Sequence, residues 1–248
     1  MAKYAVIISG QPRGVLETYE NIQESIIKPN NADVFLHSWI DREMFGKPYV
    51  ANWLKNQDKS SVASKPVPKD IDKIILDVYQ PKKYLFESPK TFKYNQAIET
   101  KQKEIPIQDI FSMLYSIRMA TEMKQAYEIE NKIVYDAVIR IRFGMKFNRP
   151  SIIDLSNFYT TGVIFAPAGF DGFENGRCFL NNISFCDHWN ISNSHLINRL
   201  SETYFNIENL ILQHGCFIQA EDLLGCWVRQ VNAIPVALLD FQYEINCK

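Results

Sequence analysis

The hydrophobic residues of the first forty positions form two kinds of pattern, continuous apolar runs and a stretch with spacings of three and four. The run KYAVIISG, residues 3–10, is rich in β-branched side chains and ends in glycine, which predicts a buried strand. The next segment, GVLETYENIQESII, has apolar side chains at spacings of three and four and predicts an amphipathic helix that Pro29 ends. ADVFLHSW, residues 32–39, then predicts a second buried strand. This strand, helix, strand order is a βαβ unit and favours a parallel sheet with a right-handed crossover.

The same alternation continues along the chain. KIILDVYQPKKYLFES, residues 73–88, predicts a short helix and a third strand, and residues 105–131 carry one apolar face and predict a long helix. YDAVIRIRFGMKF, residues 135–147, predicts a buried strand. Two further helices and a terminal strand are predicted at 194–205, 219–231 and 234–245. No repeat or linker interrupts this pattern, so a single α/β domain over residues 1–248 is expected, with any boundary near Pro150.

Composition narrows the class of protein. With 248 residues, 46% hydrophobic and 22% charged, the chain is that of an ordinary globular protein. A net charge of -1 does not indicate a general polyanion-binding surface, so no nucleic-acid partner is expected. The first residues lack the length of a transmembrane segment and the cleavage site of a signal peptide, which favours a cytoplasmic protein. Five cysteines without a C-x-x-C pair favour reduced thiols over a disulfide framework or a zinc site.

Two arginines, Arg140 and Arg142, stand two positions apart in an apolar run. Because side chains alternate along a strand, both should point to the same face. A buried guanidinium needs a carboxylate, a carbonyl or an anionic ligand, and its planar fork suits phosphate oxygens. Two interpretations stay open for this pair, namely internal ion pairs to Asp33 or Asp136 and contact with an anionic ligand.

The loops after the first two strands are further candidates for ligand contact. Gly10, Gln11 and Arg13 follow the first strand, and Ser38 lies at the end of the second. Loops that leave the carboxyl ends of parallel strands line one crevice, and the glycines of the first loop let the backbone approach a ligand closely. The spacing matches neither the dinucleotide fingerprint nor the P-loop, which disfavours dehydrogenases and P-loop kinases.

Three carboxylates are candidates for proton transfer. Asp187 is followed by His188 and Trp189, and a carboxylate beside an aromatic ring is a common arrangement for holding a sugar. Glu221 and Asp222 open a predicted helix, where an acid either stabilises the helix dipole or acts as a base on an acceptor hydroxyl. An ordinary loop role also stays open for Asp187. The histidines lack the spacing of metal ligands and G-x-S-x-G is absent, so no metal ligand or serine triad is assigned.

Taken in order, the segments VIISGQPRG, ADVFLHSW, LYSIRMATEMKQAYE, YDAVIRIRFGMKF, FCDHWNISNSH and AEDLLGCWV resemble a family of small GT-A-like glycosyltransferases. This family occurs in bacteria, phages and large DNA viruses and acts in surface-polysaccharide or glycan assembly. The resemblance spans most of the chain, with little contribution from residues 41–105. It implies a GT-A-like Rossmann-type fold whose central, mostly parallel sheet is flanked by helices. Residues 1–150 would form the nucleotide-sugar-binding half and residues 151–248 the acceptor-side half.

The resemblance also implies an activity, the transfer of a hexosyl or pentosyl group from a nucleotide-diphosphate sugar to a hydroxyl of a glycan acceptor. The donor-binding residues would be Gly10, Gln11, Arg13, Ser38, Arg140 and Arg142, and the catalytic residues Asp187, Glu221 and Asp222.

In GT-A enzymes an acid that follows the R-x-R segment coordinates a divalent metal, and here that position is Gly144. Arginines could neutralise the diphosphate instead, while Mg²⁺ or Mn²⁺ stays open as a cofactor. The alternative is a catalytically inactive nucleotide- or glycan-binding protein of the same fold. A third and weaker hypothesis is a structural assembly protein that uses the aromatic-rich back half as an interaction surface.

Overall fold

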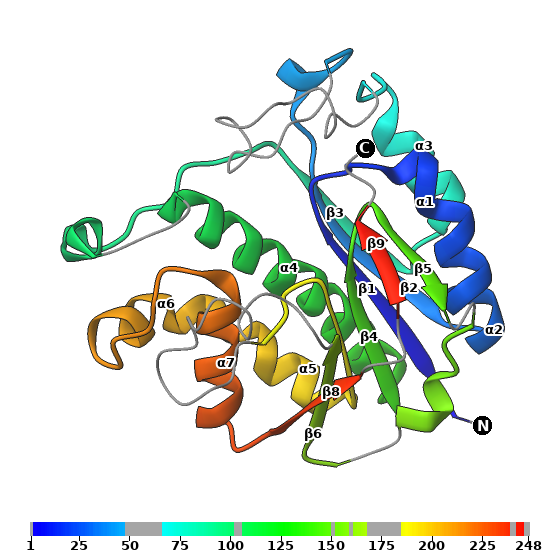
Figure 1. Cartoon of the computed structure of the whole chain (residues 1–248). Helices are drawn as coiled ribbons and strands as arrows, with labels where there is room; N and C mark the ends of the chain where they lie inside the picture. Colours follow the sequence, from blue (N-terminus) through cyan, green and yellow to red (C-terminus); the bar gives the residue numbers. More distant parts are fainter. Residues whose placement is uncertain are drawn as a thin grey trace.

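The computed structural model describes residues 2–47, 66–101, 106–149, 152–158, 161–167, 185–238 and 242–245. Its strands are β1 (Tyr4–Gly10), β2 (Asp33–Trp39), β3 (Lys83–Glu87), β4 (Ala137–Arg142), β5 (Met145–Arg149), β6 (Val163–Pro167), β7 (Trp189–Ser192), β8 (Ile234–Leu238) and β9 (Gln242–Ile245). Its α-helices are α1 (Val15–Ile22), α2 (Lys28–Asn30), α3 (Ile71–Tyr79), α4 (Ile107–Asn131), α5 (Ser194–Ser201), α6 (Thr203–Leu212) and α7 (Ala220–Gln230). Figure 1 shows these elements arranged around a central twisted sheet.

The central sheet is seven-stranded, in the order β3-β2-β1-β4-β7-β6-β8. Strands β1 to β4 run parallel, β7 runs antiparallel to both of its neighbours, and β6 pairs in parallel with β8. Strands from both sides of Pro150 share this sheet, and β5 and β9 form a separate antiparallel pair. The predicted α/β fold with a mostly parallel sheet flanked by helices is confirmed.

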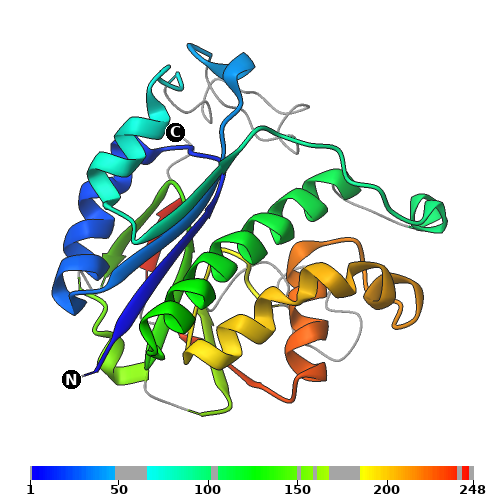
Figure 2. The same cartoon turned by 180° about the vertical axis from the view of Figure 1, so that it is seen from behind.

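Helices cover both faces of the sheet. Helix α4 packs on β1 and β2 and is joined by α5, α6 and α7 on the same side, which Figure 2 shows from behind. Helices α1 and α3 and the β5–β9 pair cover the opposite face. Each face therefore buries its own hydrophobic core, and the apolar residues of β1 and β2 alternate between the two cores.

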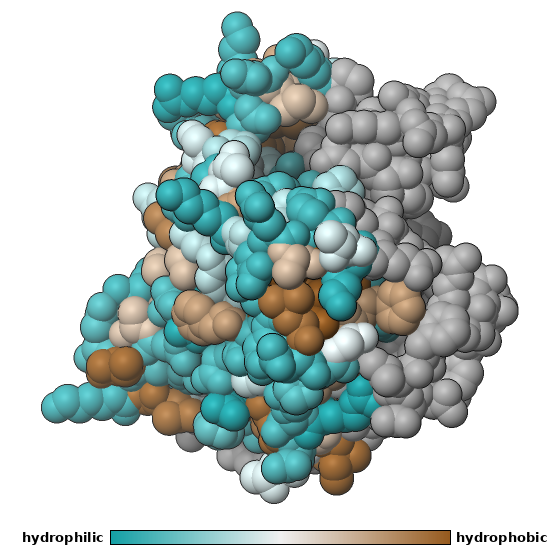
Figure 3. Space-filling model, turned by 90° about the vertical axis from the view of Figure 1, so that its left-hand side faces the viewer, coloured by the Kyte–Doolittle hydropathy of each residue, from teal (hydrophilic) through white to brown (hydrophobic). Residues whose placement is uncertain are grey.

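The surface and the helices give two further observations. Among the helices that the structure describes, none combines the length and the apolar character that a membrane crossing requires. The described part of the face shown in Figure 3 is mostly hydrophilic and carries small, separated hydrophobic patches.

Several element boundaries differ from the sequence predictions. The first helix continues through a π-helical turn, Gln23–Ile27, into α2, and it ends at Asn30, before Asn31 (φ 45°), rather than at Pro29. Asparagine tolerates this left-handed conformation, which commonly terminates helices. The segment 194–205 belongs to two helices, α5 and α6, and the segment 234–245 contains two strands, β8 and β9.

The predicted strand 135–147 is two strands, and this correction bears on the site. β4 ends at Arg142, and the chain turns at Gly144 before β5 leaves for its separate pairing with β9. Gly144 has φ 77°, a conformation that favours glycine because it has no Cβ. The turn was not visible in the sequence because Phe143 and Met145, on either side of it, are both buried and apolar.

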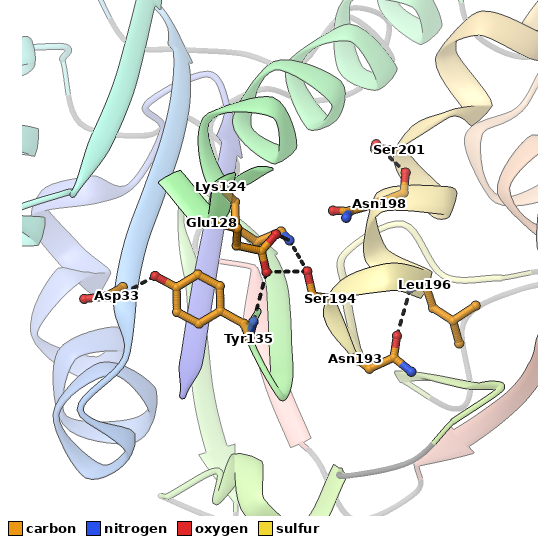
Figure 4. A network of polar contacts seen from close by, with 9 residues as sticks. All are labelled: Asp33, Lys124, Glu128, Tyr135, Asn193, Ser194, Leu196, Asn198 and Ser201. Atoms are coloured by element: carbon orange, nitrogen blue, oxygen red, sulfur yellow. Dashed lines mark hydrogen bonds and ion pairs between the residues drawn. The ribbon is translucent and has the colours of Figure 1, made fainter. Parts of the chain in front are cut away.

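A buried polar cluster fixes α4 to the amino end of β4, as Figure 4 shows. Lys124, whose side chain is 0% exposed, lies 2.7 Å from Glu128 Oε2 and also donates to Ser194 Oγ. Glu128 Oε1 accepts from Ser194 Oγ at 2.6 Å and from the backbone N of Tyr135 at 2.9 Å. We call Lys124, Glu128, Tyr135 and Ser194 the amino-end cluster.

Candidate functional site

The carboxyl ends of β1, β2 and β4 lie side by side at one edge of the sheet. Ser9 of β1 pairs with His37 of β2 on one side and with Arg142 of β4 on the other. One residue further along, Gly10 lies opposite Ser38. The loops that follow β1 and β2 therefore start next to each other, as the βαβ order predicted.

Arg140 is almost completely buried, with 1% of its surface exposed. Its Nε donates to Asn190 Oδ1 at 2.9 Å, and its Nη2 donates to the backbone O of Asp187 at 2.6 Å. Asn190 stands directly opposite Arg140 in the antiparallel register of β4 and β7. Burial lowers the pKa of Arg140 to about 10, so the guanidinium stays charged at neutral pH. Its Nη1 has no hydrogen-bond partner in the part of the chain that the structure describes.

Arg142 lies on the same face and reaches the surface. Its side chain is 29% exposed, and its Nη1 lies 3.1 Å from Oδ2 of the buried Asp187. His188 Nε2 lies 3.5 Å from the other oxygen of Asp187. Burial alone would raise the pKa of Asp187, but the charges of Arg142, His188 and Arg140 outweigh it and lower that pKa. Asp187 is therefore ionised at neutral pH.

The ion-pair partners suggested from the sequence, Asp33 and Asp136, were wrong. Asp33 begins β2 and accepts from the hydroxyl of Tyr135 at 2.6 Å, and Asp136 accepts from the backbone N of Lys3 at 2.7 Å. Both acids lie at the amino ends of their strands, whereas Arg142 lies at the carboxyl end. The partner of Arg142 comes instead from the segment that precedes β7.

Glu221 approaches this group from the first turn of α7. Its backbone O accepts from the N of Phe185 at 3.3 Å, which ties α7 to the segment that carries Asp187. Burial, and then the nearby charge of Asp187, raise the pKa of Glu221 to about 8. At neutral pH the site thus holds one ionised and one mainly protonated carboxyl group. We call Arg140, Arg142, Asp187, Asn190 and Glu221 the carboxyl-end cluster.

The other predicted site residues take different positions. Asp222 follows Glu221 in the first turn of α7 and adds to the rise in the pKa of Glu221. Gly10 ends β1 with φ 115°, and the N of Arg13 donates to the O of Gln11 at 2.8 Å in the turn that leads into α1. The donor-binding roles of this loop stay predictions.

Ser38 is not brought to the arginines. In β2 its side chain alternates onto the face of Val34 and Leu36, which α1 covers, whereas the arginines share the face that α4 covers. Ser38 is fully buried, and its Oγ has no hydrogen-bond partner among the described residues. A donor contact by this side chain would need a path through the other face of the sheet.

Trp189 does not offer its ring to a sugar. It is 0% exposed and belongs to the core on the α1 side of the sheet, with residues such as Ile139 and Ile141. The sugar-holding interpretation of this tryptophan was wrong, because the strand that starts at residue 189 turns the ring away from solvent.

Two residues of the site were missed from the sequence. Asn190, which holds Arg140, appeared there only as part of an N-x-S sequence, and its role depends on a strand register that the sequence does not show. His37 is 0% exposed and contacts Ser116 Oγ at 2.7 Å and Glu87 Oε2 at 3.0 Å. Burial lowers the pKa of His37 to about 4, so this histidine is neutral. His37 could have been recognised from the sequence, because it lies in the predicted second strand next to the candidate Ser38.

A divalent metal does not fit the described residues of the site well. Cys186, Asp187 and His188 offer ligand atoms within 4.8 Å of one another. However, Arg142 is paired with the carboxylate of Asp187, and Arg140 donates to its backbone O, so two fixed positive charges oppose a cation there. Gly144 offers no carboxylate, and its φ of 77° is a conformation that favours glycine.

Comparisons with known proteins find similarity among solved structures. No protein-family model matches the sequence, and no curated protein matches it. The chain is similar to the apo-form glycosyltransferase GlyE of Streptococcus pneumoniae TIGR4, with a TM-score of 0.43 and 10% sequence identity. The match covers 95% of this chain and 45% of that chain, so this chain spans less than half of the length of GlyE. A likeness at this level carries no argument about activity.

Proposed function

We propose that this protein is a glycosyltransferase that moves a sugar from a nucleotide-diphosphate sugar to a hydroxyl of a glycan acceptor. The observation that carries the proposal is the unmatched charge of the carboxyl-end cluster. Arg140 and Arg142 are two positive groups beside one ionised carboxylate, Asp187, and Arg140 Nη1 has no partner among the described residues. A diphosphate at this sheet edge would supply the missing acceptors.

The residues suggest how the reaction would run. Arg142, which is partly exposed, would bind the diphosphate and release Oδ2 of Asp187. The acceptor hydroxyl would attack the anomeric carbon and pass its proton to Asp187, while the bond from that carbon to the diphosphate oxygen breaks and leaves its electrons on the diphosphate. The guanidinium groups would stabilise the charge that develops on this leaving group. Asp187 is preferred as the base because Glu221 is mainly protonated at neutral pH.

The donor-binding step is tested by thermal unfolding with a panel of nucleotide diphosphates and nucleotide sugars, each with and without Mn²⁺. A donor at a hundredfold excess over its Kd should raise the Tm of the wild type by about 5 °C or more. Arg142→Gln should abolish this shift, because it removes the charge that contacts the diphosphate.

The matched control is Arg199→Gln, which removes a partly exposed arginine that pairs with Glu202 at 3.0 Å on α5. This variant should keep the shift. If no donor raises the Tm or is turned over by the wild type, with or without Mn²⁺, the proposal fails.

A second candidate, an inactive nucleotide- or glycan-binding protein, is favoured by one observation. Asp187 is held by Arg142, and no carboxylate stands at position 144. Asp187→Asn separates the two candidates, because a transferase should lose turnover by about a hundredfold to ten-thousandfold while donor binding persists. A wild type that binds donors but neither transfers nor hydrolyses them would be the binding protein. The donor sugar and the assignment of the two halves to donor and acceptor stay predictions.

A further inference from the structure

Two cysteines lie close together, one on α7 and one on the connector between α6 and α7. Cys216 lies in the connector that precedes α7, and its backbone N donates to the O of Leu210 near the end of α6 at 3.0 Å. Cys226 lies in the middle of α7. Cys216 is buried, Cys226 is half-buried, and both are free thiols whose side chains are hydrogen-bonded to each other.

The groups around Cys226 favour its ionised form. The Cys216 thiol hydrogen-bonds to its sulfur, and Arg229 Nη2 donates to the same atom at 3.3 Å. Burial of Cys226 and, after it, the charge of Asp222 one helical turn earlier act in the opposite direction. The hydrogen bond from Cys216, assisted by Arg229, lowers the pKa of Cys226 to about 7, while the same hydrogen bond and burial raise the pKa of Cys216. At neutral pH the pair thus combines a nucleophilic thiolate with a neighbouring thiol.

We propose that Cys216 and Cys226 form a redox-sensitive dithiol that hydrogen peroxide converts into a disulfide. The Cys226 thiolate attacks one oxygen of the peroxide, the O–O bond breaks, and Cys226 becomes a sulfenic acid while hydroxide leaves. The sulfur of Cys216 then attacks the sulfenic sulfur, and its proton leaves with the departing hydroxyl as water. In sum, the dithiol loses two electrons and two protons, and one peroxide becomes two waters.

The position of the pair gives this reaction a structural effect. A disulfide would tie the connector to the middle of α7, the helix whose first turn carries Glu221. Its cross-link would remove conformational freedom from the segment 216–226. The reaction itself requires no sugar donor, so its test stands independently of the proposed transferase activity.

The test is peroxide treatment of the full chain, followed by alkylation of remaining thiols, digestion without reductant and mass spectrometry. The expected product is a peptide pair linked through Cys216 and Cys226 that has lost two hydrogen atoms. Cys216→Ser should leave a sulfenic acid on Cys226 that dimedone traps, and Cys247→Ser should still form the linked pair. A disulfide that joins either residue to another cysteine, or oxidation that bypasses both, would overturn the proposal.

A second measurement covers the case in which a cysteine variant does not fold. Arg229→Gln retains both thiols but removes the donor at 3.3 Å from Cys226. The rate at which iodoacetamide alkylates Cys226 at pH 7 should fall about threefold or more, since the thiolate fraction falls. An unchanged rate in a folded Arg229→Gln variant would contradict the role of this arginine.

Discussion

The two ends of β4 carry buried ionic clusters that differ in how well their polar groups are matched. In the amino-end cluster, Lys124 and Glu128 are each bonded to two or more partners, and both carboxylate oxygens of Glu128 are used. In the carboxyl-end cluster, Arg140 Nη1 and Asp187 Oδ1 have no hydrogen-bond partner among the described residues, although His188 Nε2 lies 3.5 Å from that oxygen. Glu221 is mainly protonated there, because burial and then the nearby charge of Asp187 raise its pKa to about 8.

This difference supports a structural role for the amino-end cluster and is the basis of the ligand-binding role proposed for the carboxyl-end cluster. A buried charge without hydrogen bonds is costly, so a fold that uses ions only to join its elements matches every one of them. The amino-end cluster meets this condition and joins α4, α5 and β4. The carboxyl-end cluster does not meet it, and its unmatched atoms lie at the sheet edge where parallel folds bind ligands.

The largest effect is expected from breaking the matched cluster. Lys124→Met leaves Glu128 buried without its counterion and should lower the free energy of unfolding by about 3–5 kcal/mol, measured by urea denaturation. The control is Lys28→Met, because Lys28 forms an exposed pair with Glu24 at the same sequence spacing of four. That variant should lose less than about 0.5 kcal/mol. Equal losses in the two variants would show that the buried pair stabilises the fold no more than an exposed pair does.

A smaller and pH-dependent effect is expected in the carboxyl-end cluster. Glu221 has a pKa of about 8 in the folded protein against 4.5 as its ordinary value, so the folded state holds a proton that the unfolded state releases between these values. Its contribution to stability is therefore complete below pH 4.5 and is lost as the pH rises through 8. Glu221→Gln mimics the protonated acid at every pH and so does not lose this contribution. From pH 5 to pH 8.5, the free energy of unfolding of the variant should therefore rise by about 2 kcal/mol relative to that of the wild type, a figure reduced for partial exposure.

Urea denaturation of both proteins at several pH values measures this gain. Parallel curves of unfolding free energy against pH would show that Glu221 is not protonated in the folded protein. They would also weaken the contrast between the two clusters, because the carboxyl-end cluster would then carry a second free negative charge.

The smallest effect concerns the turn that follows β4. Gly144→Ala should cost about 1–2 kcal/mol because alanine is strained at φ 77°. Gly46→Ala is the comparison, since Gly46 has φ 73° with no atom within 4 Å of an added Cβ. Similar losses of stability in Gly144→Ala and Gly46→Ala would show that backbone conformation accounts for the glycine at position 144. A Gly144→Asp variant that acquires Mn²⁺-dependent stabilisation would instead favour a lost metal site.

The sequence predicted the parts of the fold that depend on local periodicity. The continuous apolar runs of β1 and β2 and the apolar face of α4 were each visible in single segments, and so was the shared face of Arg140 and Arg142. The turn at Gly144 was not visible, because buried apolar residues flank it on both sides.

The contacts that build the site could not be predicted in the same way. Arg142 and Asp187 are 45 positions apart, and Arg140 and Asn190 are 50 apart. These pairs meet only because β7 runs antiparallel to β4 in one register, and a shift of one residue would turn Asn190 to the other face. The charged residues of the site were therefore recognisable individually in the sequence, whereas their hydrogen-bond and ion-pair partners were not.

In the proposed transferase, the ion pair between Arg142 and Asp187 would have a kinetic consequence. The same guanidinium is assigned to the diphosphate and to the carboxylate that would accept the proton, and it is 3.1 Å from that carboxylate when no donor is bound. Asp187 would thus become available only after a donor has taken its place on Arg142. A transferase built in this way binds its substrates in a compulsory order, donor first and acceptor second.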